Sequence, residues 1–300
     1  MSNMKRAPLI GMSIFFSVAV LGSIAWQLHG YTFALLEPRG TVALAERGLI
    51  IHALLLMLIV VIPVFILIFA IAWRYRASNS KAVYTPNWEH STMEELVWWA
   101  VPIEIILVLG ALTWSSSREL DPYRPLTSEK PFVVEVVALD WKWLFIYPTL
   151  GTATLGEVDF PAGHPVEFDL TADAPMNSFW IPQLGGQMYV MTGMVTQLHL
   201  QADTPGTFRG SSANYSGDGF AHMTFAAKAL SESDFITWSA AAKTAPLTLT
   251  MDTYKILASP STNTPPITYG SVDPGLFASI INQFMPPSTQ SGHDMMPMRQ

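Results

Sequence analysis

Hydrophobic and polar positions divide the chain into an apolar N-terminal part and a longer region of alternating character. Three apolar stretches come first, at 9–26, 48–73 and 96–114. The stretch 48–73 has no Lys, Arg, Asp or Glu, and at about 1.5 Å of rise per residue it crosses a bilayer core of about 30 Å. The stretch 96–114 has tryptophans at both ends, which is typical of membrane–water interfaces. We therefore predict transmembrane helices over 48–73 and 95–115.

The first apolar stretch allows two interpretations. It follows Lys5 and Arg6 and contains small residues around Ser23, as a cleaved signal peptide does. It is also nearly long enough to be an uncleaved membrane helix. Residues 1–28 are therefore expected to be a signal peptide or an N-terminal membrane segment.

Basic residues predict the orientation of the two firm spans. Arg74, Arg76 and Lys81 lie in the connecting segment 74–94, and short loops rich in Lys and Arg remain in the cytoplasm. Everything after Trp114 is then on the outer side. This arrangement predicts a multi-pass membrane protein whose C-terminal domain lies outside, in the periplasm if the cell has one.

Beyond the second span, apolar and polar positions alternate as in half-buried β-strands. Glycine- and proline-containing turn signals fall at 161–163, 184–186 and 204–206. Their spacing predicts a β-sandwich over 128–230. The expected strand segments are FVVEVVALDWKWLFIY, VEFDLTA, QMYVMT, TQLHLQA and HMTFAAKA.

A helical region is expected to follow the sandwich, over 231–285. Ser231 or Ser233 is a suitable N-cap for its first helix. The short helices are expected at 231–242, 252–258 and 274–285. The last residues, 286–300, have the composition of a disordered tail.

The composition excludes several kinds of partner and cofactor. Half of the residues are hydrophobic and only 13% are charged, against about 25% in ordinary soluble domains, so apolar surface is needed outside a single core. The net charge of −7 argues against a nucleic-acid partner. The chain has no cysteine, which excludes disulfides, iron–sulfur clusters and thiolate-ligated copper.

Several long motifs carry a family resemblance. They are RYRASNSKAVYTPNWEHS, LDWKWLFIYP, PMNSFWIPQLGGQMYVMTGM and YSGDGFAHM. Together with two spans before a sandwich, they resemble subunit II of the haem-copper oxidases, in particular the proteobacterial ubiquinol oxidases of bo type. The resemblance runs from about residue 35 to residue 284. It implies a two-helix membrane anchor followed by an all-β, cupredoxin-like sandwich with short C-terminal helices.

In the cytochrome c oxidase branch of that family, the sandwich binds a dinuclear copper centre. The resemblance places its ligand positions at Asn177, Ser212, Asn214, Ser216, Phe220 and Met223. Ser212 and Ser216 replace the two cysteines, and only Met223 keeps a ligand of the family set. Because a copper pair of this kind needs bridging thiolates, the site is expected to be empty.

The resemblance also implies a function. Without copper this subunit cannot accept electrons from cytochrome c, so the complex is expected to oxidise ubiquinol, reduce oxygen to water and pump protons. Haems and one copper are expected in the partner subunit I, and none in this chain. Its expected partners are subunit I, the other oxidase subunits and membrane lipid.

There are three alternative interpretations of the function of this chain. A copper-bearing cytochrome c oxidase subunit is excluded by the absence of cysteine. A stand-alone, membrane-tethered cupredoxin-like binding or assembly protein, and a menaquinol oxidase subunit II, both stay open as alternatives.

Two carboxylates of the second span are candidates for function. Glu95 lies where the helix enters the membrane from the cytoplasm, a position that the helix dipole favours for an acid. The family resemblance implies proton uptake there, whereas Glu94 is expected to be a solvated neighbour. Glu104 lies about 13.5 Å deeper by helical rise, where a carboxylate is costly unless it is protonated or paired.

Structural roles are expected for the domain histidines and for the aromatic run 141–143. Metal binding is not expected at the domain histidines or at the aromatic run 141–143, which is expected to serve packing or docking. A weak copper(I) site in the C-terminal tail stays open. These domain histidines are His164, His199 and His222, and the tail residues are His293, Met295, Met296 and Met298.

Overall fold

The computed structural model describes residues 16, 19, 20, 22, 23, 26, 33–83, 85–87 and 89–285. The chain separates into two compact units, residues 1–37 and 38–300. The expectation for residues 1–28 falls largely outside the described residues. The expectations of a disordered tail over 286–300, and of copper(I) binding by its His and Met residues, lie entirely outside them.

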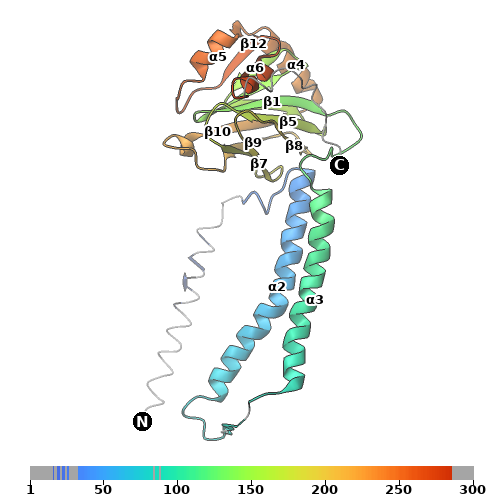
Figure 1. The fold of residues 1–300 in the computed structure, drawn as a ribbon, viewed down its shortest axis with the longest axis vertical. Helices are drawn as coiled ribbons and strands as arrows, with labels where there is room; N and C mark the ends of the chain where they lie inside the picture. The colour runs from blue at the N-terminus through green and yellow to red at the C-terminus, as the bar shows by residue number, and fades with distance from the viewer. Residues whose placement is uncertain are drawn as a thin grey trace. The chain divides into compact units, whose positions relative to one another are not determined.

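Two long helices precede the domain: α2 (Thr41–Arg74) and α3 (Thr92–Glu119). Both are long and apolar enough to cross a membrane, and they contain the predicted spans 48–73 and 95–115. In Figure 1 they form a hairpin whose connecting loop lies at the end away from the domain. Half-buried positions of α2 end at Val61, just before Pro63, and the side chains after them are exposed.

The domain is a two-sheet sandwich. One sheet has seven strands in the order β11-β12-β3-β2-β1-β5-β8, and the other has five in the order β4-β10-β9-β6-β7. The strands are β1 (Phe132–Leu139), β2 (Lys142–Tyr147), β3 (Thr152–Leu155), β4 (Glu157–Pro161), β5 (Val166–Ala172), β6 (Asn177–Trp180), β7 (Gln187–Val190), β8 (Thr196–Leu200), β9 (Gly206–Ser212), β10 (Thr224–Leu230), β11 (Leu247–Leu249) and β12 (Ile267–Val272).

Aromatic side chains fill the space between the sheets. Phe179 stacks on Phe225 with ring centroids 5.1 Å apart, and Trp143 meets Phe179 edge to face at 5.4 Å. Phe145 and Phe168 complete the cluster, and all five rings are buried. Such pairs add to the free energy gained by removing large apolar surfaces from water.

The segment expected as one long strand is a hairpin. Strands β1 and β2 are antiparallel, with Leu139 opposite Lys142, so Asp140 and Trp141 make the turn. Trp141 has φ 64°, in the left-handed region. The prediction missed this turn because Asp140 is its only common turn former, no glycine or proline accompanies it, and the apolar pattern continues through it.

The C-terminal region was predicted as helical, and this was only partly right. Helices α4 (Glu232–Lys243), α5 (Met251–Leu257) and α6 (Leu276–Asn282) are present, and Ser231 caps α4 by accepting from the Asp234 amide. Strands β11 and β12 were not expected, and they extend the seven-stranded sheet. The helices α5 and α6 contribute Tyr254 and Phe277 to a second core on the outer face of this sheet.

Backbone hydrogen bonds dock the start of α2 on the sandwich. The Arg39 amide donates to Gln183 O at 2.8 Å, and the Ala43 amide donates to Leu184 O at 3.1 Å. Gly40 pairs with Ala202 as an isolated bridge, and a Cβ there would come within 2.4 Å of a carbonyl oxygen. α2 begins several residues before the predicted span because its first turn is docked on the sandwich.

Candidate functional site

The positions that correspond to copper ligands lie in one region of the sandwich. Asn177 begins β6 and Ser212 ends β9, and the Ser212 hydroxyl donates to Asn177 Oδ1 at 2.9 Å. The Asn214 side-chain amide donates to Met176 O at 3.0 Å. Hydrogen bonds between neutral groups thus connect three of the six positions.

The other three positions lie in the loop that follows. Met223 is fully buried in the main core, and its carbonyl accepts from the Ser212 amide at 3.1 Å. Phe220, in the 3-10 helix η1 (Phe220–His222), packs against Tyr215 with centroids 5.6 Å apart. Ser216 lies in the loop before it, and its carbonyl accepts from Trp141 Nε1 at 3.2 Å.

Trp141 covers this loop. Its ring lies against Gly217, which has φ 109°, and against Gly219, where a Cβ would come within 2.3 Å of the ring. Glycine at both positions therefore lets the loop pass beneath the indole. At the positions that the resemblance assigns to copper ligands, the loop offers hydroxyl, amide and phenyl groups, whereas soft copper needs thiolate and imidazole.

Histidines do not assemble into a metal site in the described part of the chain, where no group of three or more His, Asp or Glu side chains could hold a metal ion. His199 is buried, with Nδ1 3.0 Å from Pro122 O and Nε2 3.5 Å from Glu167 Oε2. His164 lies 3.3 Å from Glu129 at the surface. His222 ends η1 and is exposed.

The aromatic run 141–143 faces mainly inward. Trp143 is fully buried in the core. Lys142 is also buried, and its ammonium donates to Ser259 O and to Ser261 Oγ, each at 2.6 Å. Burial lowers the pKa of Lys142 from its usual value. These contacts agree with the packing role expected for the run.

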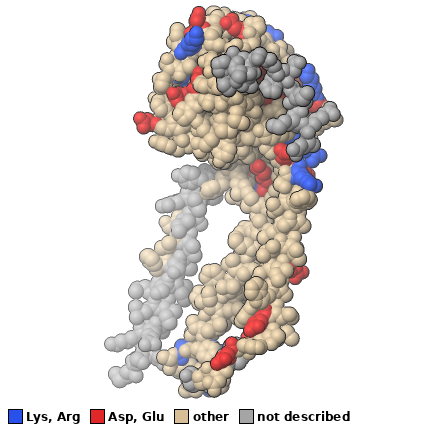
Figure 2. Space-filling model, viewed as in Figure 1, with Lys and Arg blue, Asp and Glu red and all other residues tan. Residues whose placement is uncertain are grey.

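Glu95 lies in the first turn of α3. Its carboxylate is 3.9 Å from His90 Nδ1, and both side chains are about half exposed. Glu94 is exposed, and it lines a cavity of about 990 Å³ with apolar residues of both helices, among them Ile71 and Trp98. Figure 2 shows few charged side chains along the hairpin between its two ends.

Glu104 is exposed on α3. The positions of α3 that are half-buried recur at helical spacing and face α2; they are Ile105, Leu109, Leu112 and Ser116. Glu104 lies outside this seam. Its carboxylate is therefore on a helix surface that the rest of the described chain leaves uncovered.

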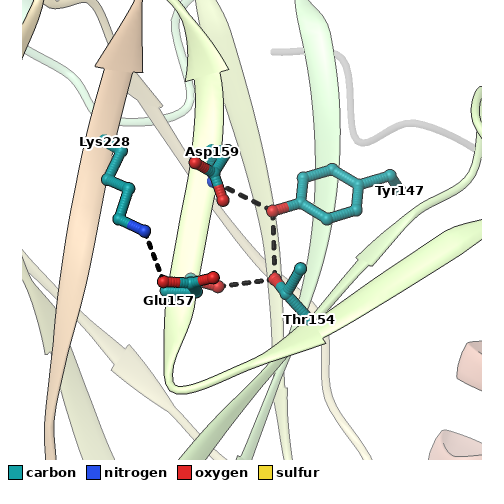
Figure 3. A network of polar contacts seen from close by, with 5 residues as sticks. All are labelled: Tyr147, Thr154, Glu157, Asp159 and Lys228. Atoms are coloured by element: carbon teal, nitrogen blue, oxygen red, sulfur yellow. Dashed lines mark hydrogen bonds and ion pairs between the residues drawn. The ribbon is translucent and has the colours of Figure 1, made fainter. Parts of the chain in front are cut away.

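A polar network lies inside the sandwich, and no motif in the sequence indicates it. The Asp159 amide donates to the Tyr147 hydroxyl at 2.9 Å, and Tyr147 lies 3.1 Å from Thr154 Oγ1 (Figure 3). Thr154 donates its only hydroxyl proton to Glu157 O, so the tyrosine donates to the threonine. Lys228 pairs with the Glu157 carboxylate.

Asp159 is the unusual member of this network. It is 2% exposed, and its Oδ2 has no hydrogen-bond partner in the described residues. Burial raises the pKa of Asp159 to about 7, although the nearby Lys228 opposes this effect. Strands that are far apart in sequence create this environment, which explains why it could not be predicted.

A membrane hairpin joined to a two-sheet sandwich, with a ligand loop that lacks thiolates, defines a membrane-anchored oxidase subunit without its copper centre. The chain is 54% identical to cytochrome bo(3) ubiquinol oxidase subunit 2 of Pseudomonas aeruginosa over 261 residues, which cover 87% of this chain and 79% of that protein. It is 45% identical to ubiquinol oxidase subunit 2 of Acetobacter aceti over 273 residues, covering 89% and 88% of the two chains. The chain belongs to the ubiquinol oxidase subunit 2 family.

Two further similarities concern parts of the chain. Residues 243–288 match the family described as the COX Aromatic Rich Motif, which spans α5, β12 and α6. Within it, the Tyr254 hydroxyl donates to Asp173 Oδ2 at 2.6 Å and so ties this region to the sandwich. The periplasmic domain of subunit II of cytochrome oxidase from Bradyrhizobium japonicum is 19% identical, with a TM-score of 0.37 over 39% of this chain and 97% of that one.

Family membership confirms the recognition made from the motifs. The chain is a subunit of a quinol oxidase, anchored in a membrane by its apolar helices. This favours an oxidase subunit over a stand-alone cupredoxin-like protein.

Proposed function

We propose that this chain is the subunit 2 of a bacterial inner-membrane complex that oxidises ubiquinol, reduces oxygen to water and pumps protons. The observation that carries the non-redox role is the pair of serines at the cysteine positions. Ser212 is engaged in a hydrogen bond with Asn177, and Ser216 offers a second hydroxyl in place of a thiolate. Electrons therefore pass from quinol to haem and copper in the partner subunit I without a relay in this chain.

The sandwich is on the periplasmic side in this proposal. Arg74 ends α2, and Arg76 and Lys81 lie in the loop between α2 and α3, so the loop is cytoplasmic and both outer helix ends reach the domain. The docking of α2 on the loop around Leu184 supports a role in assembly, because it couples the domain to the membrane anchor.

Glu95 is the proposed proton-entry residue. The reaction consumes protons at a buried centre, and Glu95 lies at the cytoplasmic end of α3, half exposed and beside His90. A carboxylate at this place is in reach of water and can take up a proton and pass it inward.

Substitution of Glu95 in the assembled complex tests this role. We expect Glu95→Ala and Glu95→Gln to slow quinol-dependent oxygen uptake about tenfold or more, because proton transfer by a positioned group contributes about 10² to 10⁴-fold. Glu95→Asp keeps the carboxylate and is expected to retain most of the activity. Haem content, read from the optical spectrum, should be unchanged in all three.

Glu94→Gln is the matched control, since it removes the neighbouring charge from the same helix turn. We expect its turnover to stay close to that of the wild type. Wild-type turnover in an assembled Glu95→Ala complex would reduce Glu95 to an acid that only stabilises the start of α3.

A further inference from the structure

Two cavities meet at Glu46 of α2. One lies between the helices, has a volume of about 370 Å³ and is lined by residues that include Thr113 and Ser116 of α3. The other lies between the hairpin and the sandwich, has a volume of about 140 Å³ and is lined by residues that include Asp121 and His199. Because Glu46 lines both cavities, its carboxylate connects the interior of the hairpin with the underside of the domain.

The position of the Glu46 carboxylate is fixed by the domain. A Cβ at residue 186 would come within 2.9 Å of Glu46 Oε1, so the carboxylate lies directly against the backbone of Gly186. Hydrogen bonds of the Ala43 amide with Leu184 O hold the preceding turn of α2 on the same loop. The cavity of about 140 Å³ is large enough for roughly four water molecules at about 30 Å³ each.

His199 lies on the other side of this smaller cavity. Its side chain is only 4% exposed, and Nδ1 is 3.0 Å from Pro122 O, a carbonyl that can only accept. Nδ1 therefore carries the proton of the neutral ring, and Nε2 is its acceptor nitrogen. Nε2 faces Glu167 Oε2 at 3.5 Å.

Beyond His199, three carboxylates lie on neighbouring strands. The Gln197 side-chain amide donates to Glu167 Oε1 at 2.9 Å and to Asp169 Oδ1 at 3.0 Å. Glu135 on β1 is opposite Asp169 on β5 in the parallel pair. The carboxylates thus form one hydrogen-bonded and electrostatically coupled group, which begins at His199.

Electrostatics favour a bound proton in this group. Burial raises the pKa of Glu135 to about 7, and the charge of Asp169 adds to the effect. Burial also raises the pKa of Asp169; the Glu167 carboxylate acts in the same direction, whereas Gln197 and His199 oppose it. Glu119 and Asp121, which line the smaller cavity, add further negative charge nearby. Like charges close together share protons rather than all ionising.

We propose that Glu46, His199 and the carboxylates Glu135, Glu167 and Asp169 form a proton-release path on the outer side of this subunit. A proton at the Glu46 carboxylate crosses water in the smaller cavity to Nε2 of His199. The imidazolium then passes it to Glu167, and the carboxylate group holds it before it leaves to bulk water. Only protons move along this path, and no electron transfer is involved. The inference rests on the proposed function, since the pumped protons come from the complex.

Time-resolved proton release tests the path in the full complex, reconstituted into vesicles with the domain outward. A pH-sensitive dye outside the vesicles reports release after an oxygen pulse, and oxygen uptake is followed in parallel. We expect release in Glu46→Gln and His199→Gln to lag behind oxygen reduction several-fold more than in the wild type. Glu129→Gln, which changes a surface carboxylate of the linker that pairs with His164, is the matched control and should keep the wild-type lag.

Infrared difference spectroscopy supplies a readout that a merely structural role would not change. Complex that carries Asp159→Asn, so that the other buried carboxyl with a pKa near 7 does not contribute, should show a carbonyl band of a protonated carboxylic acid when it is titrated across pH 7. In this background the band should be absent when Glu135→Gln is added and shifted when Asp169→Asn is added. Release in step with oxygen uptake in both Glu46→Gln and His199→Gln would overturn the path, and so would a titrating band that persists in Glu135→Gln. If the wild type shows no quinol-dependent oxygen uptake, the proposed function fails, while the carboxyl band still decides on the proton-holding group.

Discussion

At the scale of single residues, Asp159 shows how burial changes the protonation of a side chain in a way that the sequence pattern does not predict. Its backbone amide starts the hydrogen-bonded chain through Tyr147 and Thr154, while its carboxyl group lies buried with an unpaired oxygen. Lys228 is its neighbour on the parallel strand β10. The residue is polar in an alternating segment, so a sequence reading places it at the surface.

Stability should therefore depend on pH through Asp159. The folded chain keeps this proton up to about pH 7, whereas the unfolded chain releases it near pH 3.8. The stabilisation from the raised pKa is complete below pH 3.8 and is lost as the pH rises to 7. Between pH 5 and pH 8 we expect the wild type to lose about 2 kcal/mol of unfolding free energy from this group.

Asp159→Asn should remove that part of the pH dependence, because the amide does not titrate and the backbone bond to Tyr147 remains. Thermal unfolding of the detergent-solubilised chain, followed by near-ultraviolet circular dichroism, measures the difference. Asp140→Asn, in the partly buried turn between β1 and β2, is the control. An identical slope with pH in the wild type and in Asp159→Asn would contradict the assignment.

The ligand positions were the part of the candidate site that a sequence could supply. Their identities came from the family resemblance, and the structure brings Asn177, Ser212 and Asn214 into hydrogen-bonded contact with each other or their neighbours. The resemblance could not reveal Glu46 or His199, because their shared cavity forms only when α2 docks under the sandwich. Contacts between residues 150 positions apart leave no local pattern.

At the scale of elements, the long apolar stretches predicted the two helices, and the alternating segments covered six of the twelve described strands, namely β1, β2, β5, β7, β8 and β10. The missed elements have physical reasons. The β1–β2 turn at Asp140 and Trp141 has no glycine or proline, and β11 has only three residues. Strand β12 pairs with β3, more than a hundred residues earlier, so its assignment depends on tertiary contacts.

The loop between β9 and β10 allows an element-scale prediction. Substituting Asn177→His, Ser212→Cys, Asn214→Glu, Ser216→Cys and Phe220→His restores the ligand types at the family positions. We expect the folded variant to bind copper with a thiolate–copper absorption band, because Asn177 and Ser212 already lie in hydrogen-bond contact and Met223 is in place.

Metal analysis and the visible spectrum of the purified chain measure this gain. The variant that keeps Ser212 and Ser216 but carries the other three changes is the control, and it should show no such band, as should the wild type. Copper uptake without the band in the five-fold variant would mean that this loop has diverged from the ligand geometry. A coloured wild type would contradict the non-redox role itself.

At the scale of the whole molecule, the membrane hairpin exposes side chains that a partner can cover. Side chains of α2 beyond Val61 and most of α3 are exposed in the described chain, whereas the sandwich buries its own core. Lipid covers apolar residues at no great cost, but it cannot satisfy a carboxylate. Glu104 is therefore the residue that best identifies a protein-facing surface of the hairpin.

Glu104 should be neutral or hydrogen-bonded against a helix of subunit I. An ionised carboxylate in the hydrocarbon core costs about 3 kcal/mol on insertion scales, and α3 offers it no cover from α2. Glu104→Gln keeps a hydrogen-bonding group of the same size, so we expect assembly close to that of the wild type. Glu104→Leu loses the hydrogen bond but removes the cost of burying the acid, so assembly should be only slightly reduced. Co-purification of the oxidase subunits and haem content measure both effects.

Ile106→Gln, which places an amide at a different exposed position of the same helix, is the control and should lower assembly more than Glu104→Gln does. Loss of the complex in Glu104→Gln would show that the charge itself is required, and would point to an ion pair with a basic side chain of the partner.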